Sequence, residues 1–339
     1  MVWRMNQFKR ILLLYQGRVG DEHMLDYAIA LARENGACLT LATAIAPPAG
    51  ALRGLLPMSI QTLSMPNGCL IEETKRHLSR LAAGIRQGNS LINCEVIPGR
   101  PDDETLRVID NHGIDLVMMT ADYETVLGAK AFGSLAIQLM RKAPCPVWCF
   151  RPRQKDETGS VLAAVSSQNA DTEPLALDLQ ILKVAAALAR HRNGRLDILR
   201  AWELSGSDLS TIRSETTSAI RARLLNSESR TAASAVAQLC AAVDLNDLDT
   251  RVHLPRGDPP IEISQFTRRR PVDVIVMGIV RSGIAASLLG NAAEEVSQTA
   301  STSVLAIKES NPSSETGRAN GLHQKFALQA QYSRSIPQS

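Results

Sequence analysis

The sequence has few aromatic residues and no long apolar run. Aromatic residues make up 4% of the 339 positions and hydrophobic residues 45%, so the core must be built mainly from aliphatic side chains. No apolar segment approaches the roughly 20 residues that a membrane helix needs. The run from Ile11 to Tyr15 is also too short for the hydrophobic region of a signal peptide. We therefore expect a cytoplasmic protein with no membrane anchor.

Charge of one sign and metal-binding patterns are scarce as well. The 37 basic and 34 acidic residues leave a formal net charge of +3, which argues against a dedicated nucleic-acid surface. The six cysteines lie mostly in apolar, strand-like runs, and none has zinc-ligand spacing with histidines nearby. Cys145 and Cys149 would lie roughly 13 Å apart on a strand, too far for a disulfide. We expect reduced thiols and no metal site.

The stretch 271–307 has the pattern of one complete strand–helix–strand unit. Its first run, 272–277, is almost entirely apolar, as in a parallel strand that helices cover on both faces. Gly278 and Gly283 follow, Gly290 opens a helix, and the apolar run 302–307 closes the unit. Glycines just past a strand let the backbone approach a ligand, and the following helix offers free N–H groups to a phosphate.

The same arrangement occurs earlier in the chain, with fewer glycines. Equivalent residues recur at offsets of 158, 158 and 157 positions, in the pairs Asp115 and Asp273, Gly99 and Gly257, and Gly133 and Gly290. A near-constant offset of this kind indicates an internal duplication. The two halves of the chain are therefore predicted to share one fold.

Strands and helices alternate through both copies. In the first copy we predict strands at 9–15, 38–44, 92–97, 115–119 and 144–150, and helices at 21–35, 71–87, 104–111 and 135–142. In the second we predict strands at 161–165, 195–201, 249–254, 272–277 and 302–307, and helices at 173–191, 209–243, after 257 to about 268, and 292–299. We expect Asp21 to cap the first helix and the helix at 209–243 to break near Asn226. This alternation requires a parallel sheet with right-handed crossovers.

The composition also divides the chain. We predict a first domain at 1–150, a polar linker at 151–159 and a second domain at 160–308. From residue 309 to 339 the composition turns to Ser, Asn, Gln, Gly and Pro, which predicts a disordered tail.

In combination, these features resemble the universal stress protein family in its tandem form, over the whole chain to about residue 308. The motifs that carry the resemblance are Ala143-Pro-Cys-Pro-Val147, Val276-Met-Gly278, Arg281-Ser-Gly283, Gly290-Asn-Ala-Ala-Glu294, and the turns Gly99-Arg-Pro and Gly257-Asp-Pro. The resemblance implies an α/β protein with two tandem five-stranded parallel-sheet domains of the adenine nucleotide alpha hydrolase-like type. It also implies an internal pseudo-dimer, paired through the last strands, Val147–Phe150 and Val304–Ile307. We expect two separate open sheets that sit back to back, not one continuous sheet.

ATP-binding members of that family have a glycine, two residues, a second glycine, nine residues and then Gly-Ser or Gly-Thr, with an acidic residue after the first strand that reads adenine. In the first copy Thr120 and Tyr123 stand at the two glycine positions, and only Gly133 and Ser134 remain. A Cβ atom at those positions disfavours the positive φ that glycine would supply. The first-copy site is therefore predicted to be degenerate.

The second copy keeps more of the pattern. Its segment is one residue shorter than the family's, Arg281 replaces the middle glycine, and Asn291 replaces Ser or Thr. Gln16 and Ser166 occupy the positions of the acidic residue in the two copies. A residual nucleotide site would be formed by Gly278, Arg281, Ser282, Gly283, Gly290 and Asn291. The preferred alternative is that Gly278 and Gly290 only turn strand into loop and loop into helix, with Asn291 as helix cap.

The resemblance implies a stress-induced cytoplasmic factor linked to survival, including resistance to DNA-damaging agents. We expect a non-catalytic protein without a required cofactor, which acts through binding and protein contacts, since no Ser/His/Asp or Cys/His constellation is evident. Two alternatives stay open: a switch that binds or slowly hydrolyses ATP, or binds AMP, through the second domain, and a carrier of small apolar or lipid-like ligands, suggested only by the bulk of Tyr123. Arg268–Arg270 is interpreted as a basic helix end. Protein partners and homodimer formation are left open.

Overall fold

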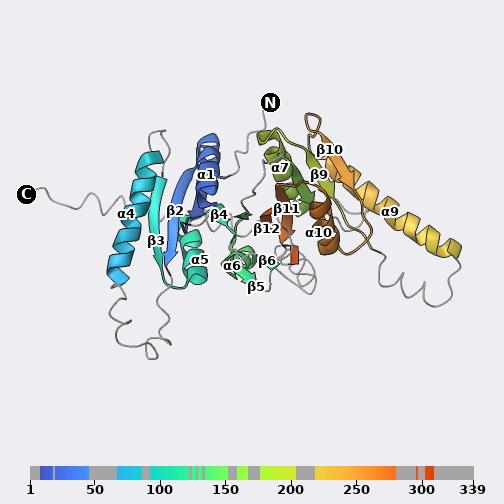
Figure 1. The fold of residues 1–339 in the computed structure, drawn as a ribbon. Coiled ribbons are helices and arrows are strands. Elements are labelled where there is room, and N and C mark those ends of the chain that lie inside the picture. The colour runs from blue at the N-terminus through green and yellow to red at the C-terminus, as the bar shows by residue number, and fades with distance from the viewer. Residues whose placement is uncertain are drawn as a thin grey trace, which may run out of the picture. The chain divides into compact units, whose positions relative to one another are not determined.

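The strands of both halves lie in a single mixed sheet. The structure is a computed structural model, and it describes residues 8–17, 20–45, 67–85, 92–121, 124–126, 129–131, 134–151, 159–166, 176–203, 218–279, 295–296 and 302–308. Within these residues, ten strands follow the order β10-β9-β8-β11-β12-β7-β4-β1-β2-β3 (Figure 1). Each half contributes five neighbouring strands, so the predicted duplication is visible as one strand order used twice.

The strand bounds agree closely with the predicted ones. The first half contains β1 (Arg10–Leu14), β2 (Cys38–Ile45), β3 (Ile92–Pro98), β4 (Leu116–Thr120) and β7 (Val147–Phe150). The second contains β8 (Val161–Ala164), β9 (Leu196–Leu199), β10 (Thr250–His253), β11 (Val274–Ile279) and β12 (Ser303–Lys308). Within each half the pairs are parallel. A separate hairpin joins β5 (Glu124–Val126) to β6 (Ala129–Ala131).

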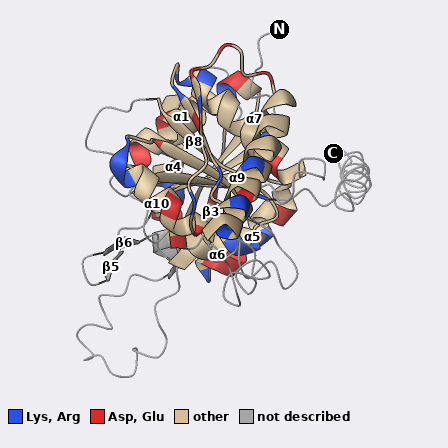
Figure 2. Ribbon diagram, turned by 90° about the vertical axis from the view of Figure 1, so that its right-hand side faces the viewer, with Lys and Arg blue, Asp and Glu red and all other residues tan. Residues whose placement is uncertain are grey.

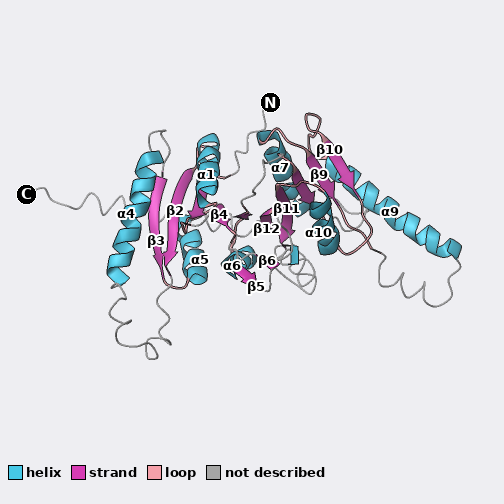
Figure 3. Cartoon of the chain, in the orientation of Figure 1, coloured by secondary structure: helices cyan, strands magenta, loops and turns pink. Residues whose placement is uncertain are grey.

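Helices cover both faces of this sheet (Figure 3). One core joins the sheet to α1 (Asp21–Asn35), α4 (Asn67–Ile85), α7 (Ala176–His191) and α9 (Ser218–Ala241). The other joins it to α5 (Pro101–His112), α6 (Ser134–Lys142) and α10 (Pro259–Arg269). Successive residues of a strand point to opposite faces, so Ile11 and Leu13 enter the first core while Leu12 and Leu14 enter the second. This explains why the strands read as unbroken apolar runs.

Some local predictions were wrong. Gly20, in the left-handed region at φ 96°, is the N-cap of α1, so Asp21 is the first helical residue and not the cap. Helix α9 continues without a break through Asn226. Helix α5 begins at Pro101, because proline fits the first turn of a helix. Most of the predicted linker, most of the helix at 292–299 and the whole predicted tail lie outside the described residues.

Equivalent residues make the same kinds of backbone contacts and turns in the two halves. The Asp115 carboxylate accepts hydrogen bonds from the backbone N–H groups of Lys9 (2.7 Å) and Arg10 (3.0 Å), at the start of β1. The Asp273 carboxylate accepts one from the backbone N–H of Ser160 (3.0 Å), just before β8. Gly99 and Gly257 have positive φ values of 123° and 153°, and each precedes a helix that starts with proline. These shared contacts confirm the internal duplication.

The two halves meet through an antiparallel pair of strands, β12 and β7. The pairs in register are Val304 with Cys149, Leu305 with Trp148, and Ala306 with Val147, and all six residues are buried. The predicted pairing of the last strands is therefore confirmed. The expectation of two separate sheets was wrong, because this pairing joins the half-sheets edge to edge. We call this strand pair the seam.

Side chains beside the seam also link the halves. Lys308 Nζ, buried at the end of β12, donates to the Arg141 carbonyl oxygen at 3.2 Å. On the α1–α7 side, the Tyr27 ring meets the His191 ring edge-on, with ring centroids 5.8 Å apart. His191 Nδ1 lies 3.3 Å from Glu34 Oε1. Backbone, aromatic and polar side-chain contacts thus all connect the two halves.

The distribution of charged residues and the apolar character of the helices agree with what the composition predicts. Figure 2 shows basic and acidic positions interspersed over the described elements, in keeping with the small net charge. Among the described residues, no helix combines the length and apolar character needed to cross a membrane.

Candidate functional site

The first-half positions of the predicted nucleotide site are described only in part. Thr120 ends β4, is 4% exposed, and its hydroxyl has no hydrogen-bond partner among the described residues. Ser134 is exposed and is the first residue of α6. Gly133 and Tyr123, the residue behind the apolar-carrier hypothesis, lie outside the described residues. A threonine thus occupies the position of the first family glycine, and its Cβ adds bulk at the carboxyl end of β4.

In the second half, Gly278 lies inside a strand and not after one. Strand β11 continues to Ile279, so Gly278 does not turn the strand into a loop, and its φ is outside the left-handed region. A Cβ atom on Gly278 would lie 2.7 Å from Leu177 Cδ2 and 3.1 Å from Ile181 Cδ1, both on α7. Close packing of α7 against β11 therefore explains this glycine. Arg281, Ser282, Gly283, Gly290 and Asn291 lie outside the described residues, so their grouping stays a prediction.

We expect Gly278→Ala to lower the free energy of unfolding by about 1–3 kcal/mol, because the added methyl group overpacks the contact with α7. Gly84→Ala is the matched control. Gly84 lies in α4 with no atom within 4 Å of an added Cβ, so alanine there should stabilise by about 0.5–1 kcal/mol. Urea unfolding of both variants measures the two effects. A neutral Gly278→Ala would contradict the packing explanation.

A buried carboxylate lies at the end of the first strand in both halves, although neither strand carries it. The Asp21 carboxylate (2% exposed) accepts the backbone N–H of Gln16 at 2.8 Å. The Asp178 carboxylate (fully buried) accepts the backbone N–H of Ser166 at 3.1 Å. In both cases the acid comes from the following helix, α1 or α7. The strand ends are thereby fixed, and these carboxylate oxygens bond to the protein's own backbone.

A cation distinguishes the two carboxyl edges. Arg200 follows β9, is 7% exposed, and donates from Nη1 to the Ala232 carbonyl oxygen at 3.0 Å. Burial lowers the pKa of Arg200, and the charges of Asp178 and Glu228 partly oppose that shift. The strand registers make Thr43 its first-half equivalent, and the hydroxyl of Thr43 donates to the Tyr15 carbonyl oxygen at 2.7 Å. The second half thus has a buried arginine where the first half has a threonine, and a buried cation of the first half, Arg151, instead follows β7. The sequence signal was an arginine directly after an apolar strand.

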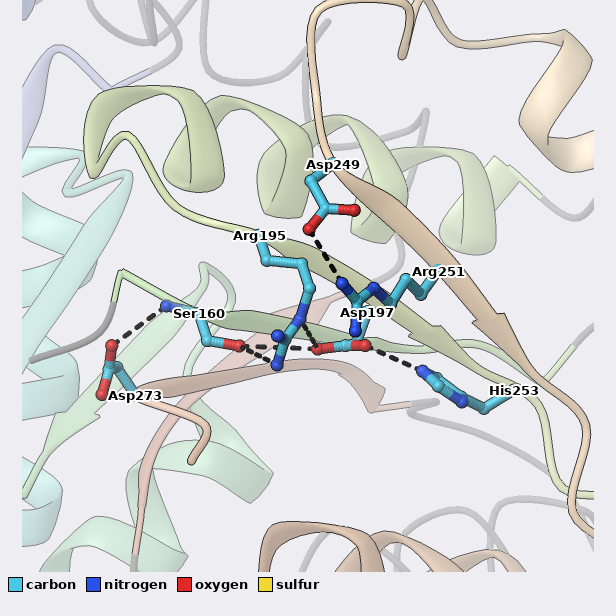
Figure 4. A network of polar contacts seen from close by, with 7 residues as sticks. All are labelled: Ser160, Arg195, Asp197, Asp249, Arg251, His253 and Asp273. Atoms are coloured by element: carbon cyan, nitrogen blue, oxygen red, sulfur yellow. Dashed lines mark hydrogen bonds and ion pairs between the residues drawn. The ribbon is translucent and has the colours of Figure 1, made fainter. Parts of the chain in front are cut away.

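A second feature, a buried ionic network, was missed by the sequence analysis (Figure 4). The Asp197 carboxylate on β9 is fully buried; its Oδ2 lies 2.8 Å from Arg195 Nε and its Oδ1 lies 2.8 Å from His253 Nε2 on β10. The hydroxyl of Ser160 is 3.5 Å from Asp197 Oδ2. The available signal was an aspartate inside the apolar run Leu196–Leu199 with an arginine two positions earlier, but His253 and Ser160 are distant in sequence.

Other predicted chemistry is limited among the described residues. Five cysteines are free, namely Cys38, Cys94, Cys145, Cys149 and Cys240. No cluster of three or more His, Cys, Asp or Glu side chains that could hold a metal ion occurs in the described part of the chain. Arg268 and Arg269 form the last turn of α10, as the basic helix-end interpretation predicts.

Comparison with known proteins identifies relatives over both halves. The model of the universal stress protein family matches residues 7–151 and 174–308. Universal stress protein E of Photorhabdus laumondii is 26% identical over 212 residues, which cover 62% of this chain and 66% of that protein. Its Escherichia coli K12 namesake is 26% identical over 211 residues, covering 62% and 65%. The chain thus matches slightly under two thirds of the length of these relatives.

Solved structures show the same fold. A putative universal stress protein from Pseudomonas aeruginosa UCBPP-PA14 superposes with a TM-score of 0.64 at 19% identity, covering 90% of this chain and 95% of that chain. A universal stress protein from Archaeoglobus fulgidus gives a TM-score of 0.55 at 16% identity, covering 90% and 97%. Both alignments span the two halves of the chain.

Proposed function

Because this chain belongs to the universal stress protein family, we propose that it is a stress-response protein that acts by binding other molecules and catalyses no reaction. Its setting would be the cytoplasm. The resemblance extends the proposal to survival after exposure to DNA-damaging agents.

The observation that carries this proposal is the state of the carboxyl edge where the family binds nucleotides. Thr120 replaces a glycine in the first half, and Gly278 in the second is explained by packing against α7. The Asp21 and Asp178 carboxylates bond to the backbone of Gln16 and Ser166. An edge with these features offers little to adenine or to phosphates, because a phosphate site needs close backbone approach and available donors.

A second candidate is a switch that binds ATP or AMP through the second half. Arg200 favours it, since it places a buried cation directly after β9, where the first half has Thr43. It is also the half that retains Gly278 and Gly290. Slow ATP hydrolysis would be part of this alternative.

Titration calorimetry with ATP and AMP distinguishes the two functions. Gly290→Asp places a negative charge where the family holds phosphates, so it would abolish nucleotide binding at that site. We expect the wild-type chain to show no binding heat that this substitution abolishes. Gly133→Asp, the equivalent change in the first half, is the matched control. A saturable heat that is lost in Gly290→Asp and kept in Gly133→Asp would overturn the proposal in favour of the switch.

A survival assay tests the biological part of the proposal. In a strain that lacks the gene, the wild-type chain and Gly290→Asp should restore survival after a DNA-damaging treatment equally well. Restoration by the wild type alone would show that the second-half site is required, and restoration by neither would remove the DNA-damage role.

A further inference from the structure

A cavity of about 440 Å³ is lined by strand β10 and helix α10. Strand β10 is the edge strand of the second half (Figure 1). Helix α10 lines it with side chains spaced three or four positions apart, which places them on one face: Glu262, Gln265, Phe266 and Arg269. Strand β10 contributes Val252 and His253. None of its lining residues belongs to the predicted nucleotide site, and the inference does not depend on the proposed function.

The charge of this cavity is asymmetric along α10. Arg269 and Arg270 are exposed at the C-terminal end, and Arg270 Cζ lies 5.2 Å from the centroid of the Phe266 ring. Arg269 Nη2 donates to Gln265 Oε1 at 3.1 Å. The carboxylate of Glu262 lies at the opposite end, folded against Gly257. Basic residues also stabilise helix C-termini. Arg268 shares that effect, but only Arg269 and Arg270 line the cavity.

The imidazole of His253 is held in a fixed orientation at the strand side of the cavity. Its Nε2 lies 2.8 Å from Asp197 Oδ1 (Figure 4). Its ring centroid lies 4.7 Å from that of Phe266. Because Nε2 is used by Asp197, the Nδ1 edge of the ring is turned away from that carboxylate. Asp197 thus acts as a positioning residue for His253.

The first half shows that the fold itself does not require this network. The strand registers place Thr40 at the position of Asp197 and Glu95 at the position of His253. Burying a carboxylate costs desolvation free energy that its ion pairs recover only in part. Because the equivalent half folds without this costly network, we attribute the network to binding and not to folding.

We propose that the β10–α10 cavity binds a small anion, a carboxylate or a phosphate, that carries a flat apolar group. The anion pairs with the guanidinium groups of Arg269 and Arg270, and the imidazole of His253 borders the same cavity on the strand side. The flat group packs on the Phe266 ring, on the α10 side of the sheet. Arginine suits this role because its planar donors match carboxylate and phosphate oxygens.

The test uses the full chain with phenyl phosphate and benzoate as probes and benzamide as the neutral control. Imidazole nitrogen resonances of His253, assigned with His253→Gln, should shift saturably with one or both anions and not with benzamide. A response to only one probe identifies the head group. By calorimetry, Arg269→Gln and Arg270→Gln should each weaken binding about tenfold, the loss expected for one charge-assisted hydrogen bond.

Arg268→Gln is the matched control, since it removes the same charge from the same helix end outside the cavity. It should change affinity less than about twofold, as expected for an exposed charge at a distance. Equal weakening of binding by all three substitutions would overturn the proposal. So would the absence of a His253 shift at about 10 mM of either anion, because a fragment of this size binds in a well-formed pocket at or below that concentration. A nucleotide also carries phosphates on a flat group. A binding heat of ATP that is kept in Gly290→Asp and lost in Arg269→Gln would therefore also place the bound nucleotide in the β10–α10 cavity.

Discussion

Replacing both Val304 and Ala306 by lysine should break the seam and separate the two halves of the chain. Both side chains are fully buried and lie in register with Cys149 and Val147 across the β12–β7 pair. A lysine ammonium at either position would be buried without a counter-charge in register. Losses of about 4–5 kcal/mol per site are at the upper end for single substitutions and fit a buried unpaired charge.

Thermal unfolding and solution scattering measure the effect. The double variant should unfold at a much lower temperature and have a larger radius of gyration than the wild type. Val252→Lys is the matched control, because it makes the same chemical change on the edge strand β10 at a valine that is 47% exposed. That control should unfold within a few degrees of the wild type, as is usual for surface substitutions. Unchanged unfolding and unchanged dimensions of the double variant would show that the seam does not hold the halves together.

The repeated fold was predictable because its signals are local and occur twice. Each strand buried on both faces leaves an apolar run, and each shared turn leaves a glycine before a proline, as at Gly99 and Gly257. Asp115 and Asp273 repeat at nearly the same offset because each fixes the start of the first strand in its own half. The pairing of the last strands followed from the resemblance. The continuity of the sheet did not, because alternation of strands and helices does not reveal how sheet edges meet.

The chemistry of the edges was less predictable, because it depends on contacts between distant residues. Asp197 and His253 are on neighbouring strands but 56 positions apart in the sequence, so no local pattern indicates that they are in contact. The role of Gly278 depends on how closely α7 approaches β11, which no spacing in the sequence contains. The acids at the strand ends, Asp21 and Asp178, come from helices and not from the strand positions where the family pattern places one.

Cys149 should be almost inert toward alkylating reagents in the native protein. Its thiol is fully buried in the seam, and burial raises its pKa from 9.0 to about 12, although the charge of Arg151 opposes the shift. Only the thiolate reacts, and its fraction at pH 8 is about 10⁻⁴ for a pKa of about 12 and about 10⁻¹ for a pKa of 9.0. The native rate at pH 8 should therefore be at least about a thousandfold below that of an ordinary thiol, and it should rise as the pH approaches 12.

A variant that retains only Cys149, with the other five cysteines replaced by alanine, makes the measurement specific to the seam. Its iodoacetamide labelling at pH 8 should be slow in buffer and reach the rate of an ordinary thiol in denaturant, which is the internal control. Adding Val304→Lys should accelerate labelling in buffer, since Val304 lies in register with Cys149. Fast labelling of the Cys149-only variant without that substitution would mean that the seam opens readily in the native state. In that event the loss of stability expected from the lysine substitutions would also be small, so the two experiments check one another.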